Sequence, residues 1–153
     1  MPSTPEPTRW LDDDELCDWL QVRRLLTQLP ARLARDLGAT DLSAADYEVL
    51  STLSEHPDDS WGLRDFATKM QWSRSRLSHH AARMEARGLI TRSPDPRDAR
   101  GSLYALTPTG SAALAEAAPV HVASVRARFL DHLSAQELAT LAAVAERIAD
   151  LPD

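Results

Sequence analysis

The chain has 153 residues, of which 17 are Lys or Arg and 23 are Asp or Glu, so its net charge near neutral pH is −6. That length fits one domain with an apolar core, and no uncharged stretch reaches the roughly 20 apolar residues of a membrane span, so we expect no membrane segment. The acidic N-terminus differs from a secretory signal, and the single cysteine, Cys17, excludes an intrachain disulfide. Both features favour a cytoplasmic protein.

Residues 1–9 contain three prolines and few apolar side chains, so we expect a disordered tail. Residues 12–37 should form the first helix, because three aspartates at its start match the helix dipole and leucines follow at helical spacing. We expect this helix to bend at Pro30 and to end at Gly38 in a left-handed conformation.

A capping box of Ser43 and Asp46 predicts a second helix that ends near Pro57. A short helix over residues 63–70 and a longer one over residues 73–87 follow.

Only Gln71 and Trp72 separate these two helices. Ser73 is suited to cap the longer helix, and Gly88 is suited to end it. Two helices joined by so tight a turn predict a helix-turn-helix, with Trp72 wedged at its corner.

Short strands are expected over residues 89–92 and 102–106, with a loop rich in Pro, Asp and Gly between them. The result is a β-hairpin with a basic tip. Thr107 and Pro108 then suit the start of a fifth helix, for which we expect a kink or break near Pro119.

A second capping box, Ser134 with Glu137, begins the last expected helix, whose apolar residues form one stripe.

Basic residues are concentrated in residues 62–102, which hold nine basic and four acidic residues for a net charge of +5, against −11 for the remainder. Clustered cations bind a polyanion by releasing the counterions condensed on its phosphates. The nine are Arg64, Lys69, Arg74, Arg76, Arg83, Arg87, Arg92, Arg97 and Arg100. Nucleic acid is therefore the expected partner.

The helix over residues 73–87 has an inner and an outer side at 100° per residue. Leu77, Ala81 and Met84 fall on the inner side. The outer side carries small, polar and basic groups of the kind that enter a major groove, with Arg76 and Arg83 as long donors. An ordinary exposed basic helix is the alternative. The outer residues are Ser75, Arg76, His79, Ala82 and Arg83.

At the hairpin tip, Arg97 and Arg100 flank Asp98. An arginine on a narrow hairpin can enter the minor groove, and we expect this role for Arg100. For Arg97, a solvated role and a phosphate contact are equally open. Asp98 should hold an arginine or the loop in place, because phosphates would repel its carboxylate.

The sequence segments RMEARGLITR, DPRDARG and LTPTG, together with the order of the expected helices and hairpin, resemble the multiple antibiotic resistance regulator (MarR) family of winged-helix transcription factors. The most specific part of the resemblance is the mutual spacing of Asp98, Arg100, Leu106, Thr107 and Gly110.

The resemblance implies an α+β, mostly helical fold in which residues 10–42 serve dimerisation, residues 43–106 form the winged helix-turn-helix lobe and residues 107–153 complete the dimerisation region. It also implies homodimers that bind pseudopalindromic operators in double-stranded DNA, usually as repressors, and that often release DNA when a small aromatic or anionic effector binds. The helix from Ser73 would be the major-groove reader. The family usually has a glycine in the turn where this chain has Gln71, so that turn should be strained or differently shaped.

For individual contacts, we expect the outer residues Ser75, Arg76, His79 and Arg83 to reach bases or adjacent phosphates. Ser73 and Arg74 would bind phosphate near the helix start, and Arg100 would enter the minor groove.

Neither a cofactor nor a metal site is expected, because His79 and His80 are adjacent on a helix and diverge by about 100°. We expect His79 to face DNA and His80 to be partly packed. Cys17 raises the alternative of a redox-sensing regulator, although its acidic neighbours oppose a reactive thiolate. Trp19 is more typical of an interface anchor, but lining an effector pocket is the alternative.

A winged-helix module used only for protein contacts is a further alternative to specific DNA binding. An enzyme is not expected, because the chain has neither a glycine-rich phosphate loop nor a nucleophile-elbow serine.

Overall fold

The computed structural model describes residues 7–56, 58 and 60–151, and at residues 99 and 100 it describes the backbone alone. The tail expected over residues 1–9 therefore lies mostly outside the described residues. The elements, in chain order, are α1 (Asp13–Leu37), α2 (Ala44–Ser54), β1 (Ser60–Gly62), α3 (Leu63–Lys69), α4 (Arg74–Ala86), β2 (Ile90–Asp95), β3 (Asp98–Leu106), α5 (Pro108–Arg128), the 3-10 turn η1 (Leu130–His132) and α6 (Ala135–Ala149).

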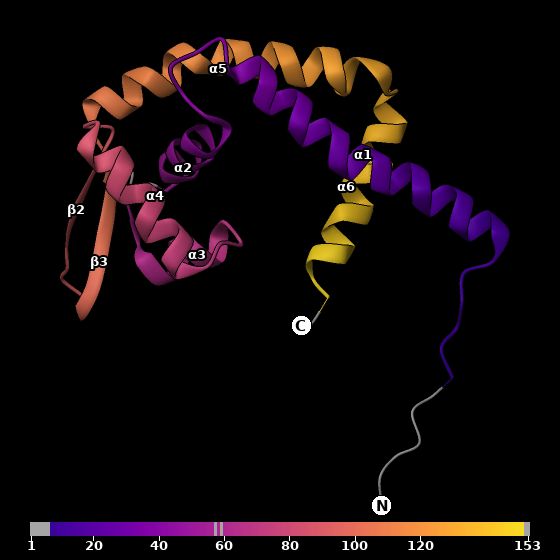
Figure 1. Cartoon of the computed structure of the whole chain (residues 1–153), viewed down its shortest axis with the longest axis horizontal. Helices are drawn as coiled ribbons and strands as arrows, with labels where there is room; N and C mark the ends of the chain where they lie inside the picture. Colours follow the sequence, from indigo (N-terminus) through magenta and orange to yellow (C-terminus); the bar gives the residue numbers. More distant parts are fainter. Residues whose placement is uncertain (1–6, 57, 59, 152–153) are drawn as a thin grey trace, which may run out of the picture.

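The molecule consists of a winged lobe and a group of long helices (Figure 1). The lobe contains α2, α3, α4 and the sheet, and it lies at the beginning of α5. Helices α1 and α5 pack against each other, and α1 extends away from the lobe (Figure 1). The expected α+β, mostly helical winged fold is confirmed.

The helix boundaries follow the capping residues read from the sequence. Capping boxes are present at Ser43 and Ser134, and the Ser73 and Thr107 hydroxyls accept the expected backbone hydrogen bonds. The first helix likewise starts with a capping box, at Asp12. These caps are local in sequence, which is why they could be predicted.

Gly38 and Pro119 differ from the expectation. Gly38 does cap α1, but its φ of −60° is right-handed. Of the kink or break expected near Pro119, the break is wrong, because α5 is continuous through it. Helix α1 is also continuous through Pro30, and the bend expected there and the kink at Pro119 stay predictions. A proline inside a helix removes one hydrogen bond, and the turns on either side can continue the helix.

The described strands form an antiparallel sheet of order β1-β3-β2. The hairpin strands are longer than expected, since the β2–β3 pairing continues to Asp95 and Asp98 with an irregularity after Pro94. Proline is tolerated there because β2 is an edge strand. The three-residue β1 was not predicted, because it is too short to show an alternating pattern and pairs with residues 103–105.

The apolar core lies mainly in the winged lobe, and Leu37 of α1 and Ala117 of α5 join it. Its largest fully buried side chains are Tyr104, Phe66, Leu50, Leu53, Leu77, Met84, Ile90 and Val49. By contrast, none of the residues of α6, all of which are described, is buried. The lobe therefore has its own core, whereas the long helices leave apolar side chains exposed.

The start of α5 packs closely at Gly110 against the link between α4 and β2. The Thr107 hydroxyl lies 2.7 Å from the Gly88 carbonyl oxygen and 2.9 Å from that of Leu89. A Cβ at Gly110 would lie 1.9 Å from the Leu89 carbonyl oxygen, so the helix can pack this closely only without a side chain. Gly88 has the left-handed φ of 73° expected for the end of α4.

Candidate nucleic-acid interface

The turn between α3 and α4 closes with a left-handed residue. Gln71 has a φ of 54°, the Trp72 amide donates to the Ala67 carbonyl at 3.0 Å, and the Gln71 amide donates to Thr68 at 3.1 Å. This pair of bonds is a Schellman motif, which usually has glycine at the left-handed position. The strain expected from Gln71 is therefore present in its backbone conformation.

All of the α4 residues predicted to face DNA are exposed. They are Ser73, Arg74, Ser75, Arg76, His79 and Arg83. Leu77, Ala81 and Met84 are buried, as their helical positions predicted. Trp72 is 9% exposed and belongs to the core, so it does fill the corner of the helix-turn-helix. Helix α4 thus presents one polar, basic side to solvent.

Two of the arginines on this side contact neighbouring rings: Arg76 stacks on Trp72, and Arg83 forms a hydrogen bond with His80. The Arg76 guanidinium carbon lies 3.7 Å from the centroid of the Trp72 ring. An Arg83 Nη2 lies 2.8 Å from His80 Nδ1. Helical spacing brings an aromatic ring next to each guanidinium, and the role of both arginines as long donors to DNA stays a prediction.

His80 and Arg87 both reach the buried Asp46 of α2. His80 Nε2 lies 2.9 Å from Asp46 Oδ1, and Arg87 Nη1 donates to Asp46 Oδ2 at 2.8 Å. Burial raises the pKa of Asp46, but hydrogen bonds from Arg87 and Ser43 outweigh it and leave the pKa below its usual value. His80 is partly buried, as expected.

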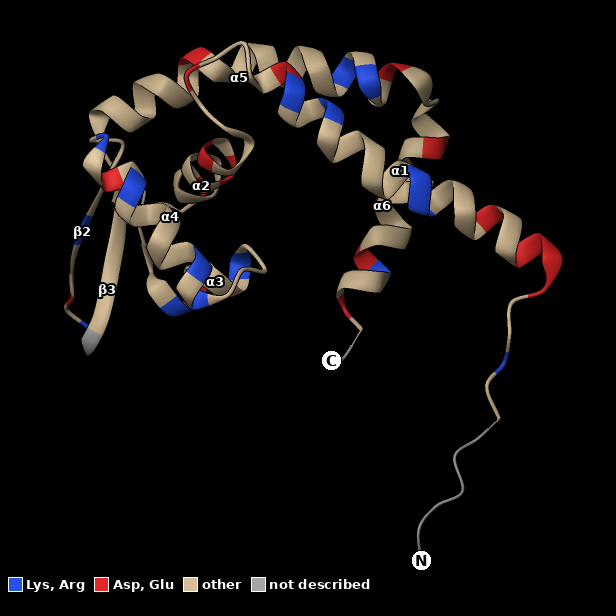
Figure 2. Ribbon diagram, viewed as in Figure 1, with Lys and Arg blue, Asp and Glu red and all other residues tan. Residues whose placement is uncertain are grey.

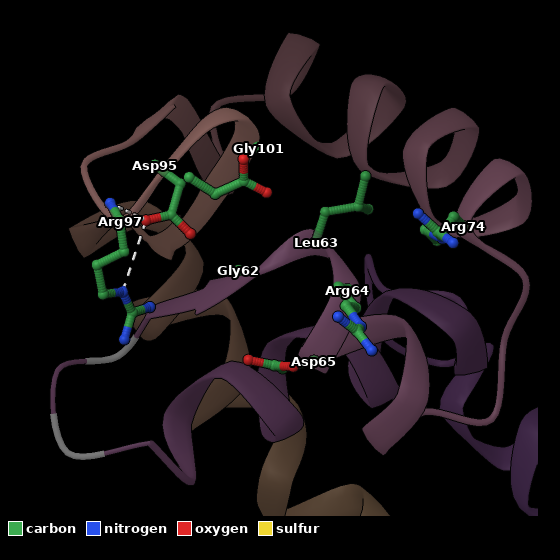
Figure 3. Close-up of a pocket in the computed structure, with 9 residues that line it drawn as sticks. Gly62, Leu63, Arg64, Asp65, Arg74, Asp95, Arg97 and Gly101 are labelled. Carbon is green, nitrogen blue, oxygen red and sulfur yellow. Dashed lines mark hydrogen bonds and ion pairs between the residues drawn. The ribbon is translucent and has the colours of Figure 1, made fainter.

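At the wing tip, Asp95 supports the turn. Its Oδ1 accepts a hydrogen bond from the Arg97 amide at 2.8 Å and lies 3.5 Å from Arg97 Nε (Figure 3). Sequence reasoning missed Asp95 and named only Asp98 as wing support; Asp98 packs where Gly101 leaves space for it, and its supporting role stays a prediction. Arg100 is in β3, but its side chain lies outside the described part.

A groove of about 400 Å³ separates the wing from the helix-turn-helix. Arg97 and Arg74 lie on opposite sides of it, with Leu63 between them (Figure 3). Arg64 also lines this groove, and with Arg74 it lines an adjoining groove of about 560 Å³ beside Gln71. Sequence reasoning counted Arg64 in the basic segment but gave it no role.

Figure 2 shows Lys and Arg on α3, α4 and β2 as well as on α1 and α5, and acidic residues on α2 and at the start of α1. The cations of α3, α4 and β2 therefore lie on the same lobe as the polar side of α4 and the grooves. An extended polyanion could contact α4 and the wing together, with its phosphates in the grooves between them.

The long helices carry the other predicted features. Trp19 is 45% exposed on α1, and Cys17 is an exposed free cysteine. A groove of about 310 Å³ between α1 and the end of α5 is lined by Arg24, Arg32 and Arg128, and Trp19 is not among its lining residues.

Comparison with known proteins shows the family to which the chain belongs. The model of the MarR family matches residues 42–102. Transcriptional regulator HosA from Escherichia coli is 35% identical over 118 residues, which cover 76% of this chain and 83% of HosA. The chain belongs to the MarR family.

Two solved MarR structures from Streptomyces coelicolor match almost the whole length of this MarR chain. AbsC has 39% identity and a TM-score of 0.88, and the match covers 94% of this chain and 97% of AbsC. Sco3205, solved in complex with DNA, has 31% identity and a TM-score of 0.89, with 95% and 92% covered. The MarR protein described here is thus a DNA-binding transcriptional regulator, as the sequence predicted.

Within the described residues, this MarR protein has no helix that is both long and apolar enough to span a bilayer.

Proposed function

We propose that this protein is a homodimeric repressor that binds a pseudopalindromic operator in duplex DNA. The observation that carries this proposal is the exposed polar side of α4 next to a wing and two grooves lined by arginines. The relative Sco3205 was solved with DNA, which supports the same use of this lobe. Such a lobe fits α4 into the major groove and the wing against the minor groove.

Within this interface, Ser75 and His79 are placed to read bases from the exposed ridge of α4, and Arg76 and Arg83 at its flank to contact bases or the adjacent phosphates. Ser73 and Arg74 would contact phosphate near the start of α4.

Arg64 joins Arg74 in lining both grooves, so we add it to the phosphate contacts. At the wing, Arg97 would contact phosphate and Arg100 would enter the minor groove, with Asp95 and Asp98 supporting the tip.

We assign dimerisation to residues 10–42 and 107–153, and DNA binding to residues 43–106. Large apolar side chains are exposed on α1 and α6, where a partner copy can cover them. A two-fold dimer presents two α4 helices and so matches a symmetric operator. The exposed apolar residues include Leu16, Trp19, Leu20, Val22, Leu26, Leu138, Leu141, Ile148 and Leu151.

Regulation would come from a small aromatic or anionic effector that binds the DNA-free form more tightly and so releases the operator. The protein would act by binding rather than by catalysis, in the cytoplasm, where it meets the genome. A thermal-shift screen of small aromatic acids, with each hit tested for operator release, examines this part of the proposal. Hits that stabilise the protein but leave the operator bound would contradict it.

The DNA-binding proposal is tested by footprinting the purified protein on the DNA upstream of its own gene. We expect one protected region with two symmetric half-sites whose centres lie about 34 Å apart on one face of the duplex. Protection without site preference that disappears at moderate salt would indicate a winged-helix module for protein contacts instead.

A further inference from the structure

His80 contacts Arg83 directly and is linked to Arg76 through the ring of Trp72. The arginine Arg83 can only donate hydrogen bonds, so Nδ1 of His80, 2.8 Å away, must be the accepting nitrogen. The other ring nitrogen, Nε2, is buried and lies 2.9 Å from Asp46 Oδ1, without the geometry of a hydrogen bond. The His80 ring therefore holds Arg83 on one side and lies against α2 on the other.

The second arginine is supported by the same imidazole through Trp72. The His80 and Trp72 rings meet edge to face, with centroids 5.6 Å apart. Arg76 stacks on the Trp72 ring at 3.7 Å. Moving the imidazole would therefore remove packing from the ring that supports Arg76.

His80 lies against a carboxylate that is itself fixed in the fold. The Asp46 side chain is 5% exposed and accepts a hydrogen bond from the Ser43 amide at 3.0 Å as part of the α2 capping box. Arg87 adds a bond of 2.8 Å to the same carboxylate and another of 2.9 Å to the Asp41 carbonyl oxygen. The imidazole thus lies between the start of α2 and the two arginines, Arg76 and Arg83, whose side chains it supports.

These contacts leave both guanidinium groups able to bind phosphate. Stacking uses the face of the Arg76 guanidinium and leaves its N–H groups at the edge, and the bond to His80 uses one of the five N–H groups of Arg83. An arginine already held in one conformation loses less side-chain entropy when it binds.

We infer that His80 is a positioning residue that fixes Arg83 and, through Trp72, Arg76 in the conformations that contact DNA. The inference rests on the proposed function and assigns to His80 a role that does not require it to touch DNA. It also separates His80 from its neighbour His79, which is exposed and placed to make contacts of its own.

A double-mutant cycle tests the inference with two matched variants. His80→Gln keeps an amide donor able to reach Asp46 but has no acceptor at the Nδ1 position, whereas His80→Asn keeps that acceptor and cannot reach Asp46. The probe is a duplex selected from a random pool by the wild-type protein. We expect Arg83→Ala to weaken binding about tenfold in the wild-type and His80→Asn backgrounds. In the His80→Gln background it should weaken binding less than about threefold.

Equal effects of Arg83→Ala in all three backgrounds would overturn the role of His80 while leaving DNA binding intact. If the wild-type protein selects no duplex, the proposed function itself fails. Side-chain ¹⁵N relaxation of the free wild-type protein covers the case in which a variant does not fold. Arg76 and Arg83 should be more rigid than Arg74, which has no hydrogen-bond or ion-pair partner among the described residues. Equal mobility of all three would overturn the inference.

Discussion

At the scale of single residues, Gln71 carries a measurable conformational cost. A left-handed conformation costs a non-glycine residue roughly 1–2 kcal/mol, and the exposed bond from Gln71 Nε2 to the Thr68 carbonyl oxygen, at 3.0 Å, offsets only part of it. Gln71→Gly should therefore stabilise the fold by about 0.5–1 kcal/mol in urea unfolding. Gln71→Ala keeps the strain without the amide and should be less stable than wild type. Destabilisation by glycine would contradict the left-handed turn.

Arg100 is the residue on which the minor-groove contact depends. Replacing it by alanine should weaken operator binding by about one to a few kcal/mol, on the order of a base contact, because the wing would lose its cation in the groove. Thermal unfolding should not change, since the residue serves binding. An unchanged affinity in a titration at fixed salt would remove the wing from the mechanism.

Which residues would lie at the interface could be predicted from the sequence, but how they are held could not. Helical periodicity places Arg76 and Arg83 on the outer side of α4. His80 lies against Asp46, 34 positions earlier in the chain, and local patterns contain no information about such a contact. Asp95 was missed because Asp98, closer to both tip arginines, offered the same chemistry in sequence.

At the scale of elements, α1 and α5 are joined by Asp36, which accepts hydrogen bonds from Arg128 at 2.9 and 3.0 Å and from Ser124 at 2.6 Å. These bonds, led by that from Arg128, lower the pKa of Asp36 to about 2. Because the folded pKa lies below the usual value of 3.8, the carboxylate stabilises the fold fully above about pH 4, and this contribution is lost as the pH falls towards 2.

Asp36→Asn should therefore be less stable than wild type near neutral pH, and the difference should shrink between pH 4 and 2. Urea unfolding across this range measures it. Parallel stability profiles for the two proteins would show that the bonds to Arg128 and Ser124 do not persist in solution.

Most elements could be predicted because capping residues and apolar spacing act over a few positions. The strand β1 could not, since its three residues pair with β3 some 40 positions away. The end of β2 was set too early and the start of β3 too late, because the Pro and Asp residues at the tip were read as loop, although the edge strand β2 accommodates Pro94.

At the scale of the whole molecule, the exposed apolar stripe of α6 predicts an obligate pairing surface. Ile148→Asp places a charge on that stripe and should shift the protein towards monomers in sedimentation analysis, with the core of the winged lobe intact. Gln136→Asp, on an exposed position of the same helix, is the matched control and should remain dimeric. If the Ile148→Asp variant stays dimeric, the dimer interface does not include the apolar stripe of α6.

The central claim is that two copies of this lobe read one symmetric duplex, and a stoichiometric titration tests it most directly. A fluorescent duplex carrying the footprinted site is titrated with protein at moderate salt, in the presence of excess random competitor. Saturation at two chains per duplex, with binding that survives the competitor, is the predicted result. Saturation at one chain, or displacement by random DNA, would contradict the account.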